Sequence, residues 1–211
     1  MEVFLNDKLV DSGFLQTDTT LEEALRHLQS HLCEPDQLVI GVRCDGREIP
    51  ANALAGALKE QVAAFARLEV STGRKSELVT EAMTQASACL TQTAEACERI
   101  ADLLTQGETA QAIEDLGECL RVWQQVHEAV AKSIEMMQLD PEAMTINGDP
   151  LADAIGKPKE ILLQIKEALQ RQDYVLLADV LQYEFSEVIH RWHDIVATIQ
   201  REAENLNADQ S

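Results

Sequence analysis

The chain has 211 residues, 45% of them apolar, and a formal net charge of −20. This length allows one large domain or two small ones, and the apolar content is enough for both to bury a core. The acidic excess repels the phosphate backbone of nucleic acids and anionic membrane surfaces, so neither is an expected partner. Such charge is typical of a solvated surface, and it would also attract a basic protein.

The N-terminus and the cysteines indicate a reducing compartment. Residues 1–8 lack the basic segment and apolar core of a secretory signal. No apolar run approaches the roughly 20 residues that span a bilayer. The five cysteines are odd in number and scattered, without a C-x-x-C pair, which favours small buried side chains over disulfides. We therefore expect a cytoplasmic protein.

The first 72 residues alternate strand-like runs with one clear helix. Residues 2–5 and 9–10 read as two strands, and the overlapping capping boxes Thr19-x-x-Glu22 and Thr20-x-x-Glu23 predict the start of a helix. The predicted buried stripe of that helix consists of Leu21, Leu25, Leu28 and Leu32. A second hairpin is expected around Asp45-Gly46, then a helix over 52–65 and a last strand over 67–71.

This order of elements resembles the ubiquitin-like β-grasp fold. Sulfur-carrier members of that fold end in a reactive Gly-Gly tail, whereas Ser71-Thr72-Gly73-Arg74 continues here into a predicted helix. The resemblance therefore excludes carrier chemistry and implies that the domain presents a sheet face or edge to a partner.

From about residue 75 to 206 the apolar residues recur at helical spacing, which predicts four helices in a mainly antiparallel bundle. The second helix begins near Thr109 and ends near Leu139, the third covers 158–171, and the fourth begins after Asp173. The inward residues predicted for the second helix are Ile113, Leu116, Leu120, Trp123, His127, Val130, Ile134 and Met137. Residues 207–211 are expected to form a disordered tail.

These patterns predict an α+β protein. A small β-grasp-like domain covers residues 1–72, and an all-α antiparallel four-helix bundle covers residues 75–206. The chain as a whole is similar to uncharacterised bacterial proteins with the same kind of final helix, here residues 173–184. That similarity implies no activity.

Histidines and carboxylates near the end of the chain form one candidate metal site. Glu187 and His190 have the Glu-x-x-His spacing of di-iron bundles, and Glu184 and His193 are close in sequence. A di-iron site needs a second motif of this kind, which the other helices do not supply. Glu23, His27 and His31 have a spacing that can share zinc, but they lie on the expected solvent side of their helix.

Aromatic residues of the bundle form a candidate ligand pocket. Trp123, His127 and Trp192 are expected on the inner sides of the second and fourth helices, where they would line a pocket or simply pack. His127 would then be either a buried base or a core histidine bonded to a neighbour.

The function these residues favour is a non-catalytic, cytoplasmic adaptor or scaffold that binds a protein, with a basic partner and a homodimer as further expectations. No catalytic residue and no cofactor is predicted, and whether the chain is an enzyme stays open. The alternatives are a metal-dependent bundle enzyme and a small-molecule sensor. In general character the chain also resembles flagellar and type III secretion chaperones, although no motif supports that analogy.

Overall fold

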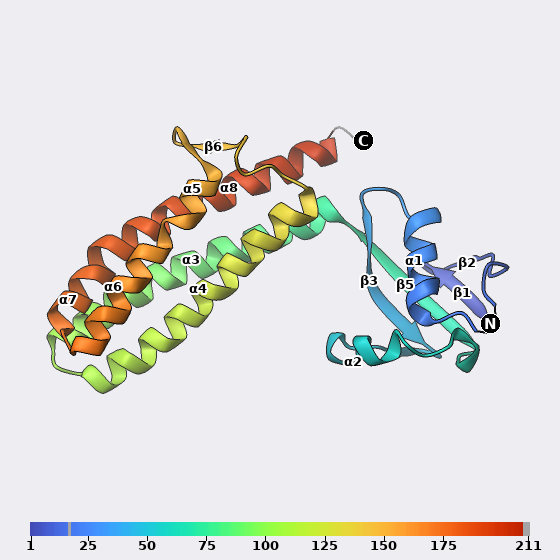
Figure 1. Ribbon diagram of the computed structural model, residues 1–211, viewed down its shortest axis with the longest axis horizontal. Coiled ribbons are helices and arrows are strands. Elements are labelled where there is room, and N and C mark those ends of the chain that lie inside the picture. The colour runs from blue at the N-terminus through green and yellow to red at the C-terminus, as the bar shows by residue number, and fades with distance from the viewer. Residues whose placement is uncertain (17, 209–211) are drawn as a thin grey trace. The chain divides into compact units, whose positions relative to one another are not determined.

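The computed structural model describes residues 1–16 and 18–208, and the chain divides into two compact units, Met1–Leu78 and Val79–Ser211 (Figure 1). The first unit contains a mixed five-stranded sheet and the second is mainly helical, so the predicted α+β class is confirmed. None of the helices in the described part of the chain has the length and the apolar character of a membrane span.

The N-terminal sheet has the strand order β2-β1-β5-β3-β4. Its strands are β1 (Glu2–Leu5), β2 (Lys8–Val10), β3 (Gln37–Cys44), β4 (Arg47–Glu48) and β5 (Arg67–Arg74). Strands β1 and β5 run parallel, whereas β1–β2, β3–β4 and β3–β5 are antiparallel. The two hairpins that the sequence predicts are therefore joined through the last strand of the unit.

Helix α1 (Leu21–His31) covers one face of this sheet (Figure 1). It begins at the predicted capping box of Thr20 and Glu23, and it buries Leu21, Ala24 and Leu28. These side chains pack against the sheet residues Val3, Val42, Cys44, Leu68 and Val70. Leu32 follows the last helical residue and is 45% exposed, so its predicted burial is wrong. The helix predicted over 52–65 is shorter, with α2 (Ala51–Ala57) followed by a 3-10 turn, η1 (Val62–Ala64).

A β-bulge interrupts the alternation of inward and outward side chains along β3. The register of β3 against β5 shifts between Val39 and Gly41, so one extra residue is inserted at that point. As a result Val39 packs against the core while Ile40 is 56% exposed. Beyond the bulge the alternation is regular, and Val42 and Cys44 are buried.

The second unit consists mainly of long helical segments (Figure 1). They are α3 (Lys75–Thr105), α4 (Thr109–Met137), α6 (Pro158–Arg171), and the continuous run of α7 (Tyr174–Asp179), η2 (Val180–Phe185) and α8 (Ser186–Ala208). The η2 segment is a π-helix, which a simple periodic pattern does not reveal. The final run begins at the predicted cap, where the Asp173 carboxylate accepts from the Leu176 N–H at 3.0 Å.

The buried stripe of α4 differs from the predicted one. Leu116, Trp123 and Val130 are buried as expected, but the other buried positions are Ala112, Cys119, Val126 and Ser133. Ile113 is 42% exposed, and His127 is also exposed. At these positions the buried residue lies one place before the predicted one, and three of the four are the small residues alanine, cysteine and serine. Small side chains allow neighbouring helices to approach closely.

A short hairpin and helix connect α4 to α6. Strands β6 (Thr145–Ile146) and β7 (Asp149–Pro150) pair around Asn147-Gly148, and α5 (Leu151–Gly156) follows. Asn147 and Gly148 therefore form the turn of a short β-hairpin between the two long helices. At the C-terminus, α8 extends through Ala208, so residues 207 and 208 are helical rather than disordered. The remainder of the predicted tail, 209–211, lies outside the described residues.

Candidate functional site

The aromatic residues predicted near one another do meet in the second unit. The ring centroids of Trp123 and Trp192 are 4.7 Å apart, and Phe185 of η2 contacts Trp123 at 5.1 Å. His127 stacks on Trp192 with 5.4 Å between centroids and 27° between planes. Both tryptophans are at most 3% exposed, so the cluster joins α4 to the final helical run.

His127 is exposed and lies on the outside of this cluster, which corrects its predicted inward position. Its imidazole therefore packs on the indole of Trp192 from the solvent side and is not a buried base. The Trp192 Nε1–H is fully buried, and within the described residues it has no hydrogen-bond partner. The aromatic cluster is therefore packed, and it leaves the indole N–H of Trp192 unsatisfied by any group that the structure describes.

The residues of the candidate metal site lie along the surface of η2 and α8. Glu184, Glu187 and His190 are exposed, and His193 is half-buried. Glu187 and Glu184 line a shallow groove together with Lys157 and Arg191, and Arg191 pairs with Glu187 at 2.5 Å. Across residues 1–16 and 18–208, no three His, Cys, Asp or Glu side chains come close enough to hold a metal ion.

A serine and a histidine that the sequence analysis did not connect lie together in the second unit. Ser87 Oγ of α3 is 3.4 Å from His193 Nδ1 of α8, at the long end of hydrogen-bond distances. Burial lowers the pKa of His193, His190 lowers it further, and Asp194 opposes the shift. Ser87 lies in the interior of a 31-residue helix, where backbone N–H groups bond within the helix and cannot form an oxyanion hole.

The histidines of α1 stack rather than chelate. The ring of His27 lies between those of Phe14 and His31, with centroid distances of 4.1 Å and 4.2 Å respectively. Glu23, the third member of the predicted trio, accepts from both the backbone N–H and the hydroxyl of Thr20. Its carboxylate therefore caps the helix. The residues at i, i+4 and i+8 thus have structural roles, one in the cap and two in ring stacking.

The face of the N-terminal sheet that α1 does not cover carries both apolar and charged side chains. Phe4 and Leu9 are register partners on this face, and Leu9 is 65% exposed. The Arg67 guanidinium lies 4.1 Å from the centroid of the Phe4 ring and pairs with Glu69 at 2.6 Å.

Ile40 lies on the same side. A Cβ added to Gly73 would be 3.1 Å from Ile40 Cδ1, and Gly73 alternates with the inward residues of β5. We refer to Phe4, Leu9, Ile40, Arg67 and Glu69 as the open sheet face.

Comparison with known proteins identifies domains but no activity. Residues 81–195 match the family described as "Domain of unknown function (DUF8042)", and residues 1–74 match the family described as "TP0873 N-terminal domain". The two matches fall on the helical and the sheet-containing regions respectively. No curated protein and no solved structure is similar enough to count as a match.

Proposed function

This protein belongs to the family described as "Domain of unknown function (DUF8042)", a description that assigns no activity. We propose, from the geometry of the chain, that it is a non-catalytic adaptor that binds another protein. The observation that carries this proposal is the open sheet face, on which Leu9 is 65% and Ile40 is 56% exposed. Exposed apolar side chains on one sheet face, interspersed with charged residues, are typical of a protein-binding surface.

The proposal includes a ubiquitin-like β-grasp assignment for the N-terminal unit. Three features support it: the order β2-β1-β5-β3-β4, the parallel pairing of β1 with β5, and a single long helix packed on one face. A fold of this kind leaves its second sheet face available for binding.

The partner we propose is a basic protein. On the open sheet face Arg67 is neutralised by Glu69, and Arg43 beside it is 3.9 Å from Glu48. The local charges therefore offset one another, and the net charge of −20 determines which proteins are attracted from a distance. The same charge opposes association of two copies, so a second copy is the less favoured occupant.

The test introduces a photo-crosslinking amino acid at Leu9 of the full chain in its native host. The matched control places it at Leu163 of α6, a leucine that is 48% exposed in the second unit. We expect Leu9, but not Leu163, to give one discrete adduct with a basic protein. Adding Ile40→Asp should remove that adduct. Equal labelling at both positions, no adduct, or an adduct with the mass of two copies would contradict the proposal.

A further inference from the structure

Two cysteines face each other between the first two helices of the second unit. Cys97 lies on α3 and Cys119 on α4, and their Sγ atoms are 3.8 Å apart. They are 1% and 4% exposed, respectively. Cys119 Sγ is also 4.0 Å from the carbonyl oxygen of Thr93. Each thiol is thus placed so that its first reaction partner inside the protein is the other thiol.

A groove leads from solvent to only one member of this pair. The groove has a volume of about 230 Å³ and lies between α3 and α4, with Thr93, Ala96 and Cys119 among its lining residues. Its charged lining includes Arg99, whose Nε is 3.8 Å from Asp115 Oδ2. Among the described residues that line the groove, Cys97 does not occur. A small solute entering the groove therefore meets Cys119 first, with Cys97 behind it.

The surroundings of the two thiols differ in a way that matches these positions. The hydrogen bond from Cys97 lowers the pKa of Cys119, and the positive charge of Arg99 lowers it further, against the effect of burial. The same hydrogen bond and burial raise the pKa of Cys97. Burial also raises the pKa of Cys33, and it raises the pKa of Cys44 to about 11. Since the thiolate is the nucleophile, Cys119 is the most favourably placed of these four for reaction.

We propose that Cys97 and Cys119 form a redox-active dithiol, in which Cys119 is oxidised by a small hydroperoxide that enters the groove and Cys97 then closes a disulfide between α3 and α4. This modification site is independent of the adaptor function and of the open sheet face.

The chemistry balances with hydrogen peroxide as the oxidant. The Cys119 thiolate attacks one peroxide oxygen, so an S–O bond forms, the O–O bond breaks, and hydroxide leaves. The product is the sulfenic acid of Cys119. Cys97 sulfur then attacks Cys119 sulfur, so the S–S bond forms and the S–O bond breaks. The hydroxide that leaves takes the Cys97 proton and forms one water. The hydroxide released in the first step takes the proton that Cys119 lost on ionisation and forms the other, so in total two thiols and one peroxide give one disulfide and two waters.

Bond formation requires a modest local movement. A disulfide has an S–S length of about 2.05 Å, so the sulfurs must approach each other by roughly 1.8 Å from their present separation. Side-chain rotation supplies part of this distance, and closer approach of the helices supplies the rest.

The test treats the reduced full chain with equimolar hydrogen peroxide, blocks the remaining thiols, and maps the products by mass spectrometry. In the wild type we expect a mass loss of about 2 Da and linked peptides that contain Cys97 and Cys119. We expect these two thiols to be lost at least about tenfold faster than Cys33 and Cys44. Oxidation at the latter residues while Cys97 and Cys119 stay reduced would overturn the proposal.

Two variants test the assigned order of reaction, and one serves as the control. Cys97→Ser should leave a sulfenic acid on Cys119 that dimedone captures, whereas Cys119→Ser should leave Cys97 reduced. Cys89→Ser changes a half-buried thiol on the same helix and should behave as the wild type. Dimedone capture on Cys97 in the Cys119→Ser protein would contradict the roles assigned here. If a variant does not fold, the wild-type peptide map alone decides the proposal.

Discussion

The imidazole of His127 stacks on the indole of Trp192, with a centroid distance of 5.4 Å. The two residues belong to different helices, yet only the tryptophan is buried. The histidine therefore contributes a contact at the edge of the aromatic cluster and does not fill its interior.

Replacing these two residues should have very different effects on stability. We expect His127→Ala to lower the free energy of unfolding by about 0.5–1.5 kcal/mol, the range of one aromatic contact. Trp192→Ala should lower it by about 3–5 kcal/mol, because it leaves a cavity in the core. Urea unfolding followed by circular dichroism measures both. Equal losses would mean that His127 is a core residue.

The orientation of α4 can be tested with two neighbouring residues. Ala112 is fully buried and Ile113 is 42% exposed. We expect Ala112→Leu to cost about 1–3 kcal/mol through overpacking. Ile113→Ala should change the free energy of unfolding by no more than about 0.5 kcal/mol. The orientation predicted from the sequence requires the opposite ranking, so the same unfolding experiment distinguishes the two.

The stripe of α4 illustrates how far the sequence predicts this fold. Leu116, Trp123 and Val130 are spaced by seven and are identified from sequence alone. The positions between them can be taken as either Cys119 or Leu120, and either Val126 or His127, because both choices give steps of three and four. Hydrophobicity favours Leu120, whereas the structure buries the smaller Cys119. Only the separation of the packed helices decides between them.

The bulge in β3 and the polar pairs depend on tertiary structure in the same way. No residue pattern marks the register shift that exposes Ile40, and Ser87 and His193 are 106 positions apart. The cysteine pair is different, because Cys97 and Cys119 are each eleven residues from Glu108, which precedes α4. Residues equidistant from the turn of an antiparallel helical hairpin lie opposite each other, so this contact was predictable.

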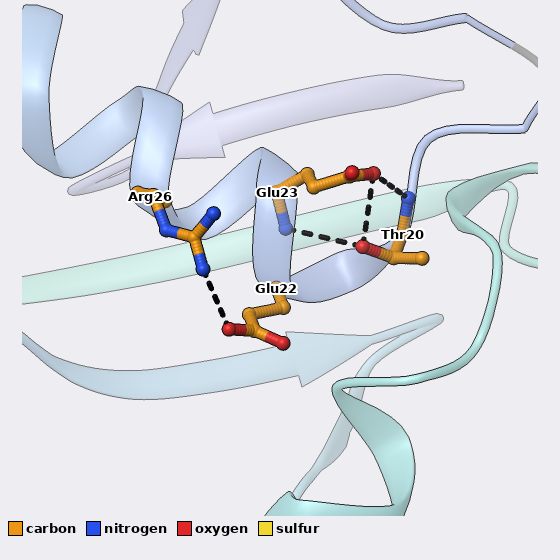
Figure 2. A network of polar contacts seen from close by, with 4 residues as sticks. All are labelled: Thr20, Glu22, Glu23 and Arg26. Atoms are coloured by element: carbon orange, nitrogen blue, oxygen red, sulfur yellow. Dashed lines mark hydrogen bonds and ion pairs between the residues drawn. The ribbon is translucent and has the colours of Figure 1, made fainter.

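The cap of α1 gives a prediction that depends on pH (Figure 2). Thr20 Oγ1 accepts from the Glu23 N–H at 3.3 Å, and Glu23 Oε2 accepts from the Thr20 N–H at 2.9 Å. That backbone hydrogen bond, followed by the hydroxyl of Thr20, lowers the pKa of Glu23. A lowered carboxyl pKa contributes stability above the pKa of the unfolded state, and this is lost as the pH falls through the folded-state value.

We therefore expect Glu23→Ala to destabilise the protein near pH 7 and the difference from wild type to narrow at about pH 3. Thr20→Ala should cost about 1 kcal/mol near neutral pH. Glu22→Ala is the matched control, since Glu22 takes no part in the capping box and pairs with the exposed Arg26 at 2.6 Å (Figure 2). Urea unfolding at the two pH values measures the effect. A Glu23→Ala difference that is the same at both would refute the assigned role.

A side-chain hydrogen bond from Asn147 Nδ2 to Asp194 Oδ2, at 2.9 Å, links the β6–β7 hairpin to α8. We expect Asp194→Ala to increase amide hydrogen exchange over residues 145–150 by up to about tenfold, the equivalent of one hydrogen bond. Global unfolding should change little, because Ile146 still packs against the core. Arg201→Ala, at an exposed position of the same helix, is the control. If exchange over the hairpin is equal in the two variants, the hydrogen bond does not anchor it.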